Sequence, residues 1–314
     1  MKKKLVAGAV TLLSVVTLAA CANGTNKDIV TMKGDTITVS DFYDEIKTNQ
    51  GAQQVLFQMT INKVFEKEYG SKVSDKEVDK ELAKQKKQLG KQFDAYLAQQ
   101  GLTEETAKKQ IRSNMLLEYA VSQAAKKDIK ESDYKTAFES YTPEVTAQII
   151  KLDSEDKAKE VLEAAKAEGA DFAQIAKDNS TDTATKDKGG EVKFDSGTAD
   201  IPSQVKEAAF KLDENGISDV ITVSAGQNYS ASYYIVKLNK KTEKGSDWKK
   251  YEKRLKEIIV NGRKQDTNFI RSVIAKAMTN ANIKVKDDAF KSTFNQYLQN
   301  IGVETSDSKS SSKK

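Results

Sequence analysis

The chain has 314 residues, a formal net charge of +5 and no histidine. Because histidine is the commonest metal ligand and the commonest general base at neutral pH, its absence argues against metal sites and most acid–base enzymes, and we expect neither a metal nor a cofactor. The single cysteine excludes an intramolecular disulfide. Lysines and glutamates are interleaved along the chain, which indicates solvated helix surfaces and argues against a nucleic-acid partner.

The N-terminus has the composition of a secretory signal. Lysines at positions 2–4 precede an apolar run over residues 5–20, which is too short to span a bilayer comfortably. The sequence therefore predicts a signal peptide over residues 1–20. The run ends in Leu-Ala-Ala-Cys at residues 18–21, which resembles the lipobox of bacterial lipoproteins. That resemblance implies that the Cys21 thiol is lipidated, so that acyl chains hold the mature protein on the extracellular face of the cytoplasmic membrane.

A short hairpin and a series of helices are predicted for the N-terminal part. Residues 29–39 alternate around Gly34, which is typical of a strand pair. Ser40 is expected to cap the helix that follows. Residues 74–77 form a capping box, Ser-Asp-Lys-Glu, ahead of a charged helix that ends at Gly90. Apolar periodicity and cap residues place the remaining helices of this part at residues 53–69, around Phe93–Leu97, from Thr103 onward, and at 133–140 after a cap at Ser132.

A different order of elements follows between residues 145 and 241. Helical and strand periodicity predict β-α-α-β-α-β-β over about a hundred residues, enough for one small core. Two adjacent glycines, Gly189 and Gly190, permit the backbone angles needed where the chain enters the second strand. The predicted strands cover residues 145–151, 188–194, 216–222 and 233–238, and the predicted helices cover 154–169, the residues after Asp171, and 204–212.

The same stretch carries several short motifs in a characteristic order. They are Asp171-Phe172, Ser180-Thr-Asp182, Gly189-Gly190, Ala-Ala-Phe-Lys-Leu at 208–212, Gly-Ile-Ser at 216–218 and Tyr-Ile-Val-Lys at 234–237. By these motifs the stretch resembles the parvulin-type peptidyl-prolyl isomerase domain. The resemblance implies a small antiparallel sheet flanked by helices. It also implies a site that lowers the barrier of roughly 18–20 kcal/mol to rotation about a prolyl peptide bond.

The resemblance further implies which positions would form the isomerase site. Parvulins place two histidines on neighbouring strands, together with an acidic residue or cysteine and a threonine. Those positions here hold, in the same order, Gln148, Tyr234, Asp182 and Thr222. We take these four as candidate catalytic residues, because glutamine and tyrosine can still hydrogen-bond although neither is an imidazole. The alternative is purely structural: Asp182 caps a turn and the other three fill the sheet.

The proline pocket of the family also has counterparts in this chain. Its methionine and phenylalanine positions fall on Ile201 and Val205, and Phe210 matches an aromatic residue of the pocket wall. These three are the candidate substrate-binding residues. Since valine is smaller than phenylalanine, the pocket is expected to be shallower than in the family. Together with the two replaced histidines, this predicts an isomerase site that is weak or lost; the alternative is a fully active isomerase with a non-histidine network.

The C-terminal part returns to helices. Apolar residues at helical spacing run from Ser246 to about Ala281, a short strand is predicted at 283–285, and a last helix at 287–301. These helices are too apolar on one side to stand alone in water, so they are expected to pack on the N-terminal region. The predicted organisation is a signal peptide 1–20, an N-terminal helical region 21–143, an inserted parvulin-like domain 144–242, C-terminal helices 243–302 and a disordered tail 303–314.

Taken together, the lipobox, the helices and the parvulin-like stretch resemble the extracellular foldase lipoproteins of Gram-positive bacteria. The resemblance implies an α+β fold in which a mostly helical, discontinuous chaperone domain carries the inserted isomerase-like domain. It implies unfolded or partly folded secreted proteins as partners, and apolar helical faces are compatible with a homodimer. A solute-binding lipoprotein is the first rival, although the two alternating α/β lobes usual in that class are missing. An adhesive or structural lipoprotein is the second.

Overall fold

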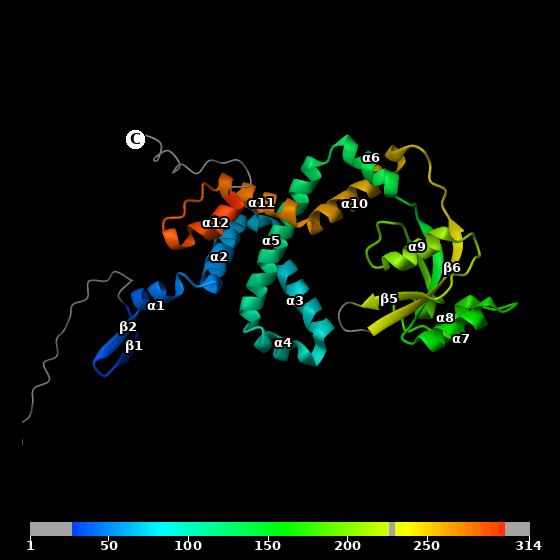
Figure 1. Cartoon of the computed structure of the whole chain (residues 1–314), viewed down its shortest axis with the longest axis horizontal. Helices are drawn as coiled ribbons and strands as arrows, with labels where there is room; N and C mark the ends of the chain where they lie inside the picture. The colour runs from blue at the N-terminus through cyan, green and yellow to red at the C-terminus, as the bar shows by residue number, and fades with distance from the viewer. Residues whose placement is uncertain (1–26, 226–229, 299–314) are drawn as a thin grey trace, which may run out of the picture. The chain divides into compact units, whose positions relative to one another are not determined.

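Figure 1 shows the computed structural model, which describes residues 27–225 and 230–298. Contacts divide the chain into two compact units: residues up to Glu68 together with those from Ile274 onward, and Tyr69–Val273. Helices predominate beside small antiparallel sheets, which confirms the predicted α+β class. None of the described helices is long and apolar enough to cross a membrane. The predicted signal peptide, Cys21 and the predicted tail lie outside the described residues.

The first unit begins with the predicted hairpin, which turns at Gly34 with a φ of +87°. The prediction that Ser40 caps the next helix is wrong, because Thr38 accepts from the Asp41 amide and the Asp41 carboxylate accepts from the Thr38 amide. The strand predicted at 283–285 is also absent from the described chain. The elements are β1 (Asp28–Met32), β2 (Asp35–Thr38), α1 (Val39–Ile46), α2 (Gln50–Tyr69), the 3₁₀ turn η6 (Asp288–Phe290) and α12 (Lys291–Leu298).

In the second unit the helices Asp75–Leu89 and Glu252–Gln265 pack on one long helix, which begins after Thr103 as predicted. The predicted capping box of Ser74 and Glu77 is present, and that helix ends at Gly90, whose φ is +52°. The elements are α3 (Asp75–Leu89), α4 (Phe93–Gln99), α5 (Glu104–Asp128), α6 (Glu131–Ser140), α10 (Glu252–Gln265) and α11 (Thr267–Asn280), which starts in this unit, with 3₁₀ turns η1 (Gly70–Lys72), η2 (Gly90–Gln92) and η5 (Trp248–Tyr251).

Helix α10 connects this helical part to the sheet domain that precedes it in the chain. It contacts both α5 and α6, and its Leu255 is fully buried. Just before it, Trp248 stacks on Tyr134 of α6 with ring centroids 5.1 Å apart. Helix α6 begins at Glu131, ahead of the predicted cap at Ser132, because Lys130 and Asp133 close its first turn. The long α5 therefore has α10 as a neighbour although about 120 residues separate them in sequence.

Residues 145–241 form a four-stranded antiparallel sheet in the order β4-β3-β6-β5, with helices on both faces (Figure 1). The element order β-α-α-β-α-β-β is confirmed. The strand predicted at 216–222 starts later than predicted, at Ile221, and ends at Ala225, and before it only Ile217 forms a bridge, to Lys237. The elements are β3 (Val145–Leu152), α7 (Glu155–Lys166), α8 (Phe172–Asn179), the 3₁₀ turn η3 (Lys186–Lys188), β4 (Glu191–Phe194), α9 (Ser203–Lys211), β5 (Ile221–Ala225) and β6 (Ser230–Lys241).

The two faces of this sheet bury different side chains, because successive strand residues point to opposite sides. On the α9 face, Ala147, Ile149 and Val236 pack with α9. On the α7/α8 face, Ile150 and Ile235 pack with α7 and α8. These five residues are at most 4% exposed, so both faces of the sheet are buried at these positions. The face on which each candidate site residue lies therefore decides what it can reach.

Candidate functional site

The three candidate substrate-binding residues lie together on the α9 face. Val205 is fully buried in the core of this face, while Ile201 and Phe210 are half-buried and pack against it. The Phe210 ring is inclined to that of Phe194, with centroids 5.8 Å apart. Val205 is therefore inaccessible in the core, while Ile201 and Phe210 are partly exposed, and a role of these three residues in binding substrate stays a prediction.

Tyr234 joins this apolar group. In the sheet register it lies opposite Ile221 on one neighbouring strand and Lys151 on the other. It is half-buried and packs on the same cluster as Val205 and Ile201. The structure thus brings one candidate catalytic residue and the candidate proline-binding residues to a single face of the sheet.

The other three candidate catalytic residues are placed elsewhere. Gln148 lies opposite Lys237 in the register and so faces α8, where its Nε2 donates to the Gly189 carbonyl at 2.9 Å. Thr222 pairs with Tyr233, is exposed, and lies on that same opposite face. No hydrogen bond joins any two of the four candidate catalytic residues, all of which lie in the described part of the chain.

Asp182 lies in the loop after α8 and bonds within its own turn. Its Oδ2 accepts from the Thr185 hydroxyl at 2.5 Å, and its Oδ1 accepts from the Ala184 amide at 3.2 Å. These contacts are expected if Asp182 has a purely structural role and caps a turn. A catalytic role for Asp182, Gln148, Thr222 and Tyr234 stays a prediction.

A buried carboxylate that the sequence did not indicate lies next to this domain's second strand. Asp195 directly follows β4 and is 6% exposed. Its two oxygens accept from Arg254 Nε at 2.6 Å and Arg254 Nη2 at 2.7 Å, and Oδ2 also accepts from the Tyr141 hydroxyl at 3.1 Å. Asp195 and Arg254 are 59 residues apart, so no local pattern could have paired them.

The charges in this cluster shift its acid–base behaviour. Burial alone would raise the pKa of the Asp195 carboxyl, but the hydrogen bonds and charge of Arg254, with the hydroxyls of Thr198 and Tyr141, more than offset this and lower that pKa. The pKa of Tyr141 is raised, first by burial and then by the negative Asp195. At neutral pH the cluster therefore holds a carboxylate, a guanidinium and a neutral phenol.

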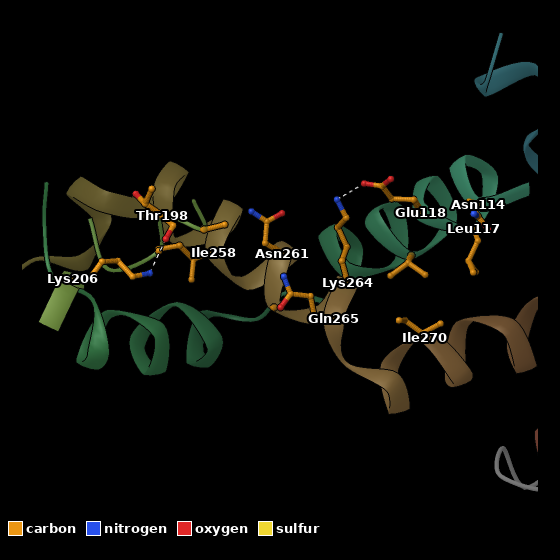
Figure 2. A pocket seen from close by; sticks show the side chains of 14 residues that line it. Asn114, Leu117, Glu118, Thr198, Lys206, Ile258, Asn261, Lys264, Gln265 and Ile270 are labelled. Atoms are coloured by element: carbon orange, nitrogen blue, oxygen red, sulfur yellow. Dashed lines mark hydrogen bonds and ion pairs between the residues drawn. The ribbon is translucent and has the colours of Figure 1, made fainter. Parts of the chain in front are cut away.

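A cleft of about 830 Å³ lies beside this cluster, between α5, α10 and the loop that follows β4. Figure 2 shows Thr198, Lys206 and Ile258 close together at one end of it. Farther along, Lys264 of α10 pairs with Glu118 of α5 at 2.5 Å. The lining mixes apolar, amide and charged side chains.

The antiparallel sheet with helices on both faces is the architecture that the resemblance to parvulin-type domains implies. Consistently, the Rotamase family model, a PPIC-type PPIASE domain, matches residues 141–240. The chain is 63% identical to the foldase protein PrsA of Streptococcus sanguinis over 302 residues, which is 96% of this chain and 90% of that protein. It is 60% identical to that of Streptococcus gordonii over the full length of both. The chain belongs to the PrsA family of foldases, which confirms the resemblance found in the sequence.

Solved structures agree with this assignment. The crystal structure of the foldase protein PrsA from Streptococcus pneumoniae superposes with a TM-score of 0.81 at 55% identity, covering 86% of this chain and 99% of that one. The corresponding protein from Lactococcus lactis gives a TM-score of 0.65 at 40% identity, covering 87% and 99%. The fold described above is therefore the fold of this family.

Proposed function

We propose that this chain is a membrane-anchored foldase that holds unfolded secreted proteins outside the cytoplasmic membrane, with an isomerase site that is weak or silent. One observation carries the second half of the proposal. The residues at the two histidine positions, Gln148 and Tyr234, lie on opposite faces of the sheet, and the sequence contains no histidine to replace them. A network that twists the prolyl amide needs its polar groups on one side of the bound proline.

A fully active isomerase is the alternative, and the position of Tyr234 favours it. This residue is half-buried and packs against the same apolar cluster as Ile201 and Val205, so it lies on the face of the sheet where the proline would bind. The two readings differ in what they require of the Tyr234 hydroxyl group. An active non-histidine site needs it, whereas a site used only for binding needs the ring.

Tyr234→Phe is therefore the sharpest test of the catalytic alternative. We expect the full chain to isomerise the peptide Ala-Ala-Pro-Phe para-nitroanilide barely above the uncatalysed rate, and the variant to do the same. Positioned acid–base groups contribute about 100-fold or more, so a working network would be easy to detect. Strong activity in the natural chain that falls by that factor in Tyr234→Phe would establish the alternative. Tyr233→Phe serves as the control, because Tyr233 is the neighbouring tyrosine of β6 and packs on the opposite face of the sheet.

The first unit supports the proposed holding of client chains. A groove of about 740 Å³ runs along α2 and the segment after α11, and it is mainly apolar. Val55 and Met59 on its rim are 60% and 51% exposed. Exposed apolar surface of this kind, next to flexible methionine, suits the binding of varied unfolded segments.

Anchoring through Cys21 completes the proposal. The supporting observation is the lipobox-like sequence, and two acyl chains would give stable attachment because each buried CH₂ contributes about 0.8 kcal/mol. We expect Cys21→Ser to move the protein from the membrane fraction to the medium of a Gram-positive host. Mass spectrometry of the N-terminal peptide should show acyl groups only in the natural chain. A Cys21→Ser protein that stays with the membrane would contradict lipid anchoring.

The domain scheme is part of the same proposal. We expect residues 21–143 and 243–302 to form one chaperone domain into which residues 144–242 are inserted. The contacts of α10 with α5 and α6 support this arrangement, because they join helices from before and after the inserted sheet.

A further inference from the structure

We propose that Arg254, which lies outside the isomerase domain, positions the segment that carries its proline site, and does so through Asp195. The inference rests on the proposed function, in which the apolar site around Ile201 contacts client chains. In the described part of the chain, the hydrogen bonds and ion pairs of Arg254 go to Asp195 and Glu257 and not to the candidate site residues, so Arg254 is a positioning residue and not a catalytic one.

Five hydrogen-bond donors converge on the carboxylate of Asp195. Its carboxylate accepts hydrogen bonds from Arg254 Nε, Arg254 Nη2, the Tyr141 hydroxyl, the Gly197 amide and the Thr198 hydroxyl, at 2.6 to 3.1 Å. A bidentate arginine–carboxylate pair fixes direction as well as distance. Since Gly197 and Thr198 belong to the loop after β4, the guanidinium of α10 organises that loop.

The same loop, which follows β4, also packs closely on α10. A Cβ placed on Gly197 would lie 2.4 Å from the Cδ1 and Cγ1 atoms of Ile258. The loop backbone therefore lies directly against the Ile258 side chain, which would have to move if residue 197 carried a Cβ. The ion pair and this contact are adjacent, and Figure 2 shows Thr198 and Ile258 side by side at the end of the cleft.

Hydrogen bonds also connect this loop to α9, which carries part of the proposed proline site. Lys206 of α9 donates from Nζ to the Ser196 carbonyl at 3.0 Å and to the Thr198 carbonyl at 2.7 Å. Its neighbour Val205 is buried in the core against which Ile201 packs, and Ile201 lies between the loop and the helix. The loop is thus tied to α10 on one side and to α9 on the other. A change at Arg254 is passed to Ile201 and Val205 through these bonds.

The experiment compares the full chain with Arg254→Met, which removes the charge and keeps an unbranched side chain, and with Arg254→Lys, which keeps the charge and loses the bidentate geometry. Two variants serve as controls. Glu257→Gln removes the other carboxylate on Arg254. Arg263→Met breaks ion pairs of the same helix with Asp128 and Asp133, away from the sheet.

The first readout is the Ile201 δ1 methyl signal in methyl-labelled NMR spectra. We expect it to move by more than its linewidth in Arg254→Met, to move less in Arg254→Lys, and to stay unchanged in both controls. Signals of Ile61 and Ile111, in other parts of the chain, should stay in place and report intact folding. An unmoved Ile201 signal in a folded Arg254→Met protein would overturn the inference, and Arg254→Lys decides in the same way if Arg254→Met does not fold.

The second readout separates this inference from the proposed function. Titration with Ala-Ala-Pro-Phe para-nitroanilide should perturb the Ile201 methyl signal of the natural chain. The peptide should bind roughly tenfold more weakly to Arg254→Met, since small misplacements of binding groups have effects of this size or larger. If the peptide leaves Ile201 unperturbed in the natural chain, the proline site is wrong, while the first readout still decides whether Arg254 positions the segment. Binding to Arg254→Met at full strength would count against the inference.

Discussion

Replacing Gly190 by alanine is expected to destabilise the isomerase domain by about 3 kcal/mol or more. Gly190 has a φ of +79°. An L-residue in this region costs about 1–2 kcal/mol by itself. A Cβ would also lie 2.5 Å from the Ile149 carbonyl oxygen and 3.0 Å from its amide nitrogen. Ile149 is a core residue of β3, and its amide donates to the Gly190 carbonyl at 2.9 Å, so the added methyl must displace the strand and stretch this bond.

The chain offers a matched control in Gly169→Ala. Gly169 has a similar φ of +75°, but nothing lies within 4 Å of the Cβ position. This variant should therefore show only the backbone cost of about 1–2 kcal/mol. Urea unfolding gives both free energies, and hydrogen exchange at the Ile149 and Ile150 amides reports the sheet directly. Equal losses of stability in the two variants would mean that Gly190 does not lie against β3 as described.

Local signals explain what could be predicted of the fold. The Ser74–Glu77 capping box and the Thr103 start are made by residues three apart, so the sequence contains everything that forms them. The order of elements between residues 145 and 241 also follows from local periodicity. The error at Ser40 is of the same local kind. Thr38 has Asp41 three residues later and can close a capping box, which a hydroxyl alone does not guarantee.

Strands were harder to predict because a strand needs a partner. Residues 283–285, Ile-Lys-Val, alternate as a strand would, but no neighbouring strand lies beside them in the described structure. Residues 216–220 have one bridging residue, Ile217, and the ladder with β6 starts only at Ile221. Apolar composition cannot distinguish these cases, since the hydrogen-bonding partner comes from elsewhere in the chain.

The sequence also could not predict which candidate site residues lie on the same face of the sheet. A family position maps a residue along the chain, but a shift of one residue changes the face of the sheet on which it lies. Thr222 faces away from Tyr234, while Ile221 and Val223 pack on the cluster that includes Tyr234. Val205 and Phe210 lie together because both belong to helix α9, and Ile201 packs on the same cluster from two residues before that helix.

Asp195→Asn is expected to lower the free energy of unfolding by about 2 kcal/mol at pH 7. The loss of a buried ion-pair partner costs about 3–5 kcal/mol, and part of this is regained because Arg254, 32% exposed, can be solvated. The asparagine amide also presents hydrogens toward the guanidinium, which removes one of the paired acceptors. Glu257→Gln, which affects the exposed side of the same arginine, should cost well under 1 kcal/mol.

The stability difference between the natural chain and Asp195→Asn should depend on pH, in a direction fixed by the pKa of Asp195. The folded-state pKa of Asp195 lies below its unfolded value of about 3.9, so the folded state binds this proton more weakly than the unfolded state. Its stabilisation is therefore complete above about pH 5 and disappears as the pH falls through the folded-state pKa. Urea unfolding of both proteins from pH 8 to pH 3 should give a constant difference down to about pH 5 that shrinks in more acid solution. A difference that stays constant throughout would mean that the Asp195 charge does not stabilise the fold. One that widens in acid would mean that its pKa is raised, in which case Arg254 would not hold the carboxylate in its ionised form.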